Sequence, residues 1–273
     1  MSFRAVSLLY HDVVPDGQWA SSGFQTIDAN KYKLTCNDFR AHLQAIAQKI
    51  HRGPATAREL LAGEPADFPF LITFDDGGVS AAEHIAGMLD ELGWKGHFLV
   101  TGNRIGTRGF LDRSQIVDLH RRGHIIGSHS HTHPLLMATC SPQQLFEEWS
   151  RSGDALAEIL GEPIHVASIP GGQYSHAVAK AAAKAGIRLL FNSEPTTRSR
   201  TLDGCLILGR FSLKRGHPAS RSAAIVAGNW SPKLHDYAIW NSKKIGKRVL
   251  GDAWLRLRSL LQGDRRKDAR EME

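Results

Sequence analysis

Short apolar runs alternate with amphipathic segments along most of the chain, and this alternation constrains the fold more than any other feature. The apolar runs have the length of buried strands, and they cover residues 6–10, 68–74, 96–101, 124–127, 166–169, 189–191 and 206–213. Segments with apolar residues at helical spacing lie between them, at residues 37–50, 57–62, 80–92, 114–122, 142–160 and 175–185. Strands that alternate with helices predict an α/β fold in which helical crossovers join the strands of a parallel sheet.

Capping residues indicate where several of these helices begin. Ser141 followed by Pro142 is the strongest signal, because serine caps a first turn and proline is tolerated at the first helical position. Thr35 or Asn37 is expected to cap the first long helix. Ser80 is expected to cap the helix that follows the second strand.

Polar side chains gather where the predicted strands end. These groups are His11-Asp12, Asp75-Asp76, the histidines from 129 to 133, Pro170-Gly171-Gly172 and Asn192-Ser193-Glu194. The carboxyl ends of parallel strands meet at one edge of a sheet, and the active sites of such folds lie at that edge. We therefore expect the polar groups to share one site.

Two adjacent carboxylates, Asp75 and Asp76, follow directly on the apolar run from 68 to 74. An Asp-Asp-Gly sequence is typical of a solvated turn, but here a buried strand runs straight into it. Burying one carboxylate is costly, and burying two costs more unless a cation or a proton relieves their repulsion. Because neighbouring residues of a strand face opposite sides, we expect one carboxylate to bind a metal ion and the other to act as a general base.

His129 and His133 can supply the other ligands of that ion. If their segment is helical, the two imidazoles face the same way and can meet at one ion. With one carboxylate they form a two-histidine, one-carboxylate set, which leaves positions open for water and substrate. The pattern predicts a catalytic metal site, and the alternative is a pair of loop histidines without a ligand.

The composition is that of an ordinary soluble protein, with 273 residues of which 42% are hydrophobic and 22% are charged. This length suits one α/β barrel, which typically takes roughly 250 residues. The three cysteines are widely spaced, so they exclude a disulfide framework and favour a reducing compartment. No apolar stretch reaches the roughly 18 residues of a membrane span, and the first residues lack a signal-peptide pattern, so we predict a cytoplasmic location.

Much of the net charge of +7 comes from the C-terminal part of the chain. The pattern there is helical and basic, and we predict an amphipathic extension over residues 231–273 that follows a barrel domain over residues 1–230. A basic segment attracts anionic surfaces in general, so weak attraction to an anionic membrane is possible and no specific partner is indicated. We expect no nucleic-acid partner, and the sequence does not predict the oligomeric state.

Two segments together resemble the NodB-like polysaccharide deacetylase family. They are Thr73-Phe-Asp-Asp-Gly77 and His129-Ser-His-Thr-His133-Pro134. The Leu9-Tyr-His11 opening and the Pro170-Gly-Gly172 segment are similar to that family as well. The resemblance implies a distorted (β/α) barrel of seven or eight repeats and the metal-dependent removal of N-acetyl or O-acetyl groups from a sugar or polysaccharide.

The resemblance also implies roles for single residues. Asp75 is the general base, and Asp76, His129 and His133 bind a divalent ion, most simply zinc, with cobalt, nickel and manganese as alternatives. The water on that ion attacks the acetyl carbonyl after Asp75 takes its proton, and the Gly171 N–H and the metal hold the oxyanion. The expected partner is an N-acetylated sugar or polysaccharide. The residues expected to contact it are His11, Pro170, Gly172, Tyr174 and Arg210.

Three features depart from the family's pattern. The family carries an arginine that pairs with its catalytic aspartate; that position is Ser168 here, and Arg210 is a candidate replacement. The family's fourth-motif aspartate and tryptophan are not evident. The Leu-x-His segment that carries the general acid is not recognisable, and His217 is the nearest candidate by order along the chain.

Two other functions stay open. A hydrolase acting on another amide or on a cyclic imide would keep the same site with a non-sugar substrate. A sugar-binding homologue that has lost activity would explain the missing arginine and acid. The presence of Asp75 argues against this second alternative, because the metal does not require that carboxylate and a protein without activity would not need it.

Overall fold

The computed structural model describes residues 3–63, 67–134 and 136–229. The predicted extension at 231–273 lies outside these ranges, so the extension and its boundary with residues 1–230 stay predictions. None of the described helices is long and apolar enough to cross a membrane.

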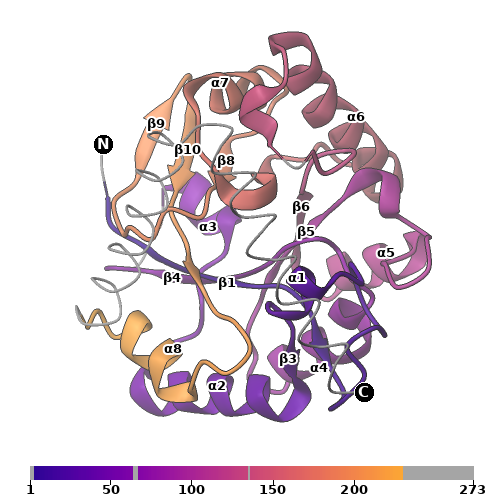
Figure 1. Cartoon of the computed structure of the whole chain (residues 1–273). Coiled ribbons are helices and arrows are strands. Elements are labelled where there is room, and N and C mark those ends of the chain that lie inside the picture. Colours follow the sequence, from indigo (N-terminus) through magenta and orange to yellow (C-terminus); the bar gives the residue numbers. More distant parts are fainter. Residues whose placement is uncertain (1–2, 64–66, 135, 230–273) are drawn as a thin grey trace, which may run out of the picture. The chain divides into compact units, whose positions relative to one another are not determined.

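A nine-stranded sheet, in the order β11-β1-β4-β5-β6-β7-β8-β10-β9, forms the centre of the described chain (Figure 1). Its strands are β1 Val6–Tyr10, β4 Phe70–Phe74, β5 His97–Val100, β6 Ile125–Ser128, β7 Val166–Ser168, β8 Leu189–Phe191, β9 Arg200–Leu202, β10 Cys205–Leu208 and β11 Phe211–Ser212. Neighbouring strands run parallel except β9, which is antiparallel to β10. The sheet curls into an open half barrel, which confirms the predicted distorted barrel architecture.

The helices lie between the strands, as the alternation predicted. They are α1 Ile27–Asn30, α2 Cys36–Lys49, α3 Ala57–Ala62, α4 Ala86–Asp90, α5 Arg113–Arg121, α6 Pro142–Leu160, α7 His176–Lys184 and α8 Ala219–Val226. The Thr35 side chain accepts a hydrogen bond from the Asp38 N–H and caps α2, and Ser141 caps α6 in the same way. A second, two-stranded sheet pairs β2 Val13–Val14 with β3 Leu34–Thr35.

Ser80 does not cap a helix, contrary to the prediction. The segment after it begins as a π-helix over Ala81–Ile85 and continues as α4, without a side-chain cap. The Ser80 hydroxyl instead donates to Asp12 Oδ1 at 2.8 Å. Asp12 is a buried carboxylate, and leaving it without hydrogen-bond donors would be costly.

Alternate residues of β4 belong to different parts of the interior. Phe70 and Phe74 are buried in the larger apolar cluster, which the side chains of α2 complete. Leu71 belongs to a second apolar cluster on the other face of the sheet. Because side chains alternate along a strand, Thr73 and Asp75 continue the face of Leu71, so a polar layer follows the apolar one as the strand reaches its carboxyl end.

Candidate active site

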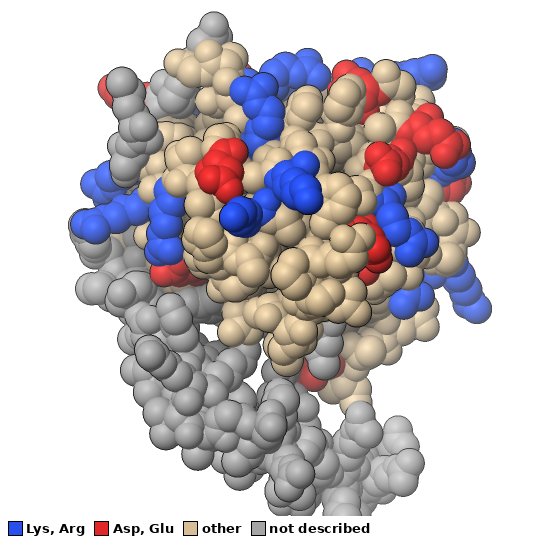
Figure 2. Space-filling view, turned by 90° about the horizontal axis from the view of Figure 1, so that it is seen from above, with Lys and Arg blue, Asp and Glu red and all other residues tan. Residues whose placement is uncertain are grey.

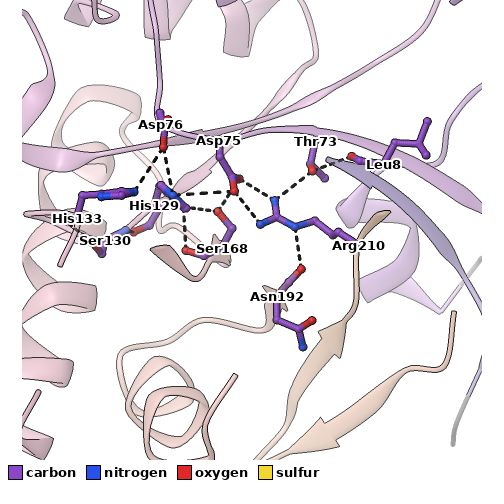
Figure 3. Close-up of polar contacts among 11 residues, drawn as sticks. Leu8, Thr73, Asp75, Asp76, His129, Ser130, His133, Ser168, Asn192 and Arg210 are labelled. Carbon is purple, nitrogen blue, oxygen red and sulfur yellow. Dashed lines mark hydrogen bonds and ion pairs between the residues drawn. The ribbon is translucent and has the colours of Figure 1, made fainter. Parts of the chain in front are cut away.

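The candidate site lies at the carboxyl edge of the sheet, where three strands each deliver a polar group. Asp75 and Asp76 follow β4 directly, and the Asp75 N–H continues the strand ladder by bonding to the Tyr10 carbonyl at 3.1 Å. His129 follows β6, and Ser168 is the last residue of β7. Figure 3 shows these side chains converging from their separate strands.

Asp76, His129 and His133 form a compact group. Asp76 Oδ1 lies 3.4 Å from His129 Nε2 and 3.6 Å from His133 Nε2. The three candidate ligand atoms all lie within 4.8 Å of one another. One ion could therefore reach all three atoms after small side-chain adjustments.

The turn that carries the two histidines is not helical, so the predicted reason for their convergence is wrong. Ser130 and His133 adopt positive φ angles of 63° and 59°, which are uncommon for residues with a side chain. Glu148 of α6 holds the turn by accepting hydrogen bonds from the N–H groups of His131 and Thr132, at 3.0 and 2.8 Å. Strained backbone of this kind is typical of functional sites.

Ser168 connects the metal-ligand group to Asp75. Its hydroxyl donates to Asp75 Oδ1 at 2.9 Å and lies 2.6 Å from His129 Nδ1. Since the hydroxyl proton is used on Asp75, the oxygen accepts the Nδ1–H of His129. This assigns the tautomer in which His129 Nε2 carries a lone pair toward Asp76, the form that binds a metal.

Arg210 clamps Asp75 from the opposite side (Figure 3). Its two terminal nitrogens each donate to one oxygen of Asp75 at 2.7 Å, and its Nε donates to the Asn192 carbonyl at 2.9 Å. One terminal nitrogen also donates to Thr73 Oγ1 at 3.2 Å. Arg210 is fully buried, so it positions Asp75 and does not contact a substrate as the sequence had suggested.

The two neighbouring carboxylates have pKa values that move in opposite directions. Burial by itself raises the pKa of Asp75, but the charge and hydrogen bonds of Arg210, with His129, bring that pKa below its ordinary value. Burial and the charges of Asp75 and Asp12 raise the pKa of Asp76 well above its ordinary value. Asp75 is therefore held ionised by the protein, whereas ionised Asp76 still needs a cation.

The two imidazoles are neutral at neutral pH. Burial lowers the pKa of His129 to about 3, and burial also lowers the pKa of His133. A neutral imidazole has a free lone pair for a metal, and a buried carboxylate that lacks a counter-charge supplies the negative ligand. The three side chains therefore fit a divalent ion.

The comparisons with known proteins agree with this chemistry. Residues 62–190 match the family model described as polysaccharide deacetylase. This part of the chain is therefore similar to the polysaccharide deacetylase family. The chain is also 26% identical over 223 residues to the protein named "Putative polysaccharide deacetylase YxkH" of Bacillus subtilis (strain 168), a match that covers 80% of this chain and 75% of the relative.

Two solved structures share the fold. The deacetylase PplD of Streptococcus pyogenes, in complex with acetate, has a TM-score of 0.67 at 18% identity and covers 80% of this chain and 96% of its own. IcaB from Ammonifex degensii has a TM-score of 0.65 at 20% identity and covers 82% of this chain and 97% of its own. At these identities the likeness concerns the fold alone.

Among the other residues expected in this site, His11 lies beside Asp75. It follows β1, the strand that pairs with β4, and its ring centroid lies 4.7 Å from that of Tyr32. Its Nδ1 is buried and has no hydrogen-bond partner within the described part of the chain. Burial lowers the pKa of His11 to about 4, against the opposing charge of Asp75.

His217, the acid suggested by order along the chain, belongs to a different set of contacts. Its Nδ1 accepts a hydrogen bond from the Lys214 N–H at 3.3 Å, and its carbonyl lies 3.0 Å from His42 Nε2. His42 belongs to α2, which covers the outer face of the sheet. These contacts hold the loop after β11 against that helix and do not involve Asp75.

The segment after β7 contributes less side-chain surface than expected. Pro170 and Gly172 are buried, and a side chain at Gly172 would overlap Ser193, so neither is available as the substrate contact that we predicted. Gly171 is exposed with a φ of 65°. Tyr174 is half-buried under the guanidinium of Arg200, which lies 5.7 Å from its ring centroid.

The sequence analysis placed Asp12 at the site but missed the buried polar group that Asp12 forms with its neighbours. Asp12 accepts hydrogen bonds from Ser22 at 2.5 Å and Ser80 at 2.8 Å, and the buried Lys33 donates to the Trp19 and Ser22 carbonyls at 2.6 and 2.7 Å. The signal for Asp12 was present, since it follows β1 at the same edge as the other polar groups. Nothing in the local sequence marks Lys33 as buried.

Proposed function

We propose that the chain is a metal-dependent hydrolase that removes N-acetyl or O-acetyl groups from a sugar or polysaccharide. The observation that carries the proposal is the division between two adjacent carboxylates. Asp76 faces two neutral imidazoles, whereas Asp75 is clamped by Arg210 within reach of the same group. Similarity to the polysaccharide deacetylase family supports the sugar substrate, and favours it over a non-sugar amide or a cyclic imide.

Asp76, His129 and His133 would hold the divalent ion, for which zinc suits the two-nitrogen, one-oxygen donor set. When bound, the ion would supply Lewis acidity, which lowers the pKa of water and polarises an acetyl carbonyl. Cobalt, nickel and manganese remain possible occupants of the same donor set.

Asp75 would take the proton of the attacking water. Its Oδ1 is occupied by Arg210 and Ser168, whereas its Oδ2 accepts one Arg210 hydrogen bond and lies 3.9 Å from His129 Nε2. Oδ2 is therefore the oxygen that faces the metal-ligand group and has a lone pair to spare. The clamp fixes this oxygen in position, which is the main requirement for a general base.

His11 is our candidate for the acid that protonates the leaving nitrogen, in place of His217. Its buried Nδ1 needs a partner, and β1 places it beside the strand that carries Asp75. Because burial lowers its pKa to about 4, the imidazole is neutral in the free protein, and the proton that it donates would be the one that Asp75 takes from the attacking water. Such a proton passes readily to a departing amine, which is far more basic.

Gly171 supports the developing oxyanion in this proposal. The neighbouring Gly172 N–H is already bonded to the Ile169 carbonyl at 2.7 Å, whereas Gly171 lies exposed at the tip of the turn. A backbone N–H at this point needs no particular side chain, so the change from arginine to Ser168 leaves it unaffected.

Acetate release tests the function and the acid together. Purified protein loaded with zinc or cobalt is assayed on N-acetylhexosamine oligomers and on an O-acetylated sugar, with His11→Gln and His217→Gln variants beside wild type. We expect His11→Gln to lose about 10²- to 10⁴-fold in kcat and His217→Gln to keep its rate. His51→Gln, an exposed histidine at the end of α2, is the control. Wild type that releases no acetate from any of these sugars overturns the proposal.

A further inference from the structure

Two cations, Lys214 and Arg215, lie over aromatic rings in the loop that follows β11. Lys214 Nζ lies 4.8 Å from the centroid of the Tyr32 ring, and the Arg215 guanidinium lies 4.3 Å from that of Trp19. Each ring holds its cation by a cation–π contact and leaves the other N–H groups free to bind.

The pair lies at the same edge of the sheet as the catalytic group. Strand β1 lies between β11 and β4, so His11 follows the middle strand and Asp75 the far one. Since adjacent strands are about 4.8 Å apart, the loop after β11 begins about 10 Å from Asp75. The Tyr32 ring bridges part of this interval, since it contacts His11 on one side and Lys214 on the other.

Backbone and buried contacts fix the rings and the cations in place. The Arg215 N–H donates to the Lys31 carbonyl at 3.0 Å, which joins the loop after β11 to the segment that carries Tyr32. The buried Lys33 donates to the Trp19 carbonyl at 2.6 Å. The fold therefore sets the backbone positions from which the two cations and the two rings extend.

The two cations are not neutralised within the described part of the chain. Neither Lys214 nor Arg215 forms an ion pair with an acidic residue there, whereas the neighbouring Lys31 pairs with Asp28 at 2.6 Å. Arg215 is exposed and Lys214 is half-buried, so both can reach a ligand. An unpaired positive pair next to a catalytic site attracts a negatively charged group of the substrate.

We propose that Lys214 and Arg215 form an anion subsite, and that the substrate is an acetylated sugar with a phosphate or carboxylate next to the acetylated unit. This inference rests on the proposed deacetylase function and names its substrate class. The ammonium and guanidinium groups donate charge-assisted hydrogen bonds to the anion, while the acetyl group reaches the metal-ligand group and Asp75.

Matched substrates test the subsite. The KM and kcat of wild type and of the Lys214→Gln/Arg215→Gln double variant are measured on a neutral N-acetylglucosamine oligomer, on N-acetylglucosamine 1-phosphate, and on a disaccharide of N-acetylglucosamine and glucuronic acid. We expect the double variant to raise KM by about tenfold or more for a charged substrate and to leave the neutral one unchanged. The charged substrate that shows the effect identifies the anion as phosphate or carboxylate. Arg121→Gln, an exposed arginine at the far end of α5, is the matched control.

A binding measurement separates the subsite from the catalytic proposal. Calorimetry on the Asp75→Asn protein compares N-acetylglucosamine 1-phosphate and the charged disaccharide with neutral N-acetylglucosamine, and needs no turnover. Tighter binding of a charged sugar that the double substitution removes supports the subsite even where no acetate is released. Equal binding of charged and neutral sugars, or equal losses for both in the double variant, overturns it.

Discussion

At the scale of single residues, the site depends on giving two identical neighbouring side chains different surroundings. Asp75 receives a bidentate arginine and a serine hydroxyl, so it is ionised without a metal. Asp76 receives two imidazoles and, among the described residues, no ion pair with a lysine or arginine, and burial raises its pKa. The same chemical group can therefore be a base at one position and a ligand at the next.

Arg210 pairs with Asp75, as expected of the candidate replacement for the arginine that the resemblance places at Ser168. The guanidinium comes from the link between β10 and β11 and still makes two parallel hydrogen bonds to the base. Ser168 joins Asp75 to His129. The arginine that holds Asp75 therefore comes from the link between β10 and β11, and not from the strand that carries Ser168.

Replacing Arg210 should damage both stability and activity. In Arg210→Met, Asp75 remains buried without its counter-charge, so we expect about 3–5 kcal/mol less free energy of unfolding and at least a hundredfold lower kcat. Arg210→Lys should retain part of both, because an ammonium supplies charge without the bidentate geometry. Urea unfolding and acetate release measure the two effects.

Arg200→Met is the matched control, since Arg200 pairs with Glu194 at the surface and exposed pairs contribute little. An Arg210→Met protein with normal stability and rate would mean that the clamp has no role in holding Asp75.

At the scale of helices and strands, the sequence predicted best the elements that depend on interactions between residues close together in the chain. The apolar runs became strands, and Thr35 and Ser141 cap the helices that they were expected to cap. The run at 206–213 became two strands, because the Gly209-Arg210 link breaks it and turns the arginine inward. Strand β9 was missed, since two of its three residues are exposed and it lacks an apolar face.

The candidate site was predictable in part. The sequence predicted that Asp76, His129 and His133 lie together. The histidines meet through a turn with positive φ angles, however, and not through a helix. Order along the chain suggested His217 as the acid, whereas the acid that we propose is His11, because order along the chain does not give order across the sheet. Strand β1 pairs with β4, so His11 lies beside the base although it is far from it in sequence.

At the scale of the whole described molecule, the Asp75–Arg210 pair spans the interior of the curled sheet. The chain passes from β10, near one end of the sheet, to β11 at the other end, and Arg210 lies on this link. The bond to Asp75 therefore ties together strands that do not pair with one another.

Basic and acidic side chains are interspersed on the face that Figure 2 presents.

Buried neutral histidines make the stability of the molecule depend on pH. His97 is fully buried; its Nδ1 lies 3.0 Å from the Ile72 carbonyl, and its Nε2 accepts the Ala57 N–H at 2.9 Å. Burial lowers the pKa of His97 from 6.5 to about 4. The unfolded chain therefore binds this proton first as the pH falls, so stability is lost between about pH 6.5 and about pH 4.

We expect the urea midpoint of wild type to fall steadily over that interval, and His97→Gln to show a shallower fall from a lower starting stability. The exposed His51→Gln should follow wild type. A midpoint that stays constant from pH 7 to pH 4.5 would rule out this histidine as a source of acid lability.

The central claim is that Asp76, His129 and His133 hold a divalent ion while Asp75 performs chemistry and is not needed to bind the ion. The most direct measurement is bound metal and acetate release on the same Asp75→Asn sample, with His133→Ala beside it. We predict that Asp75→Asn binds zinc as wild type does and loses at least about a hundredfold in rate, whereas His133→Ala loses both zinc and activity. An Asp75→Asn protein that keeps its rate, or a wild-type protein that works fully without metal, would contradict the account.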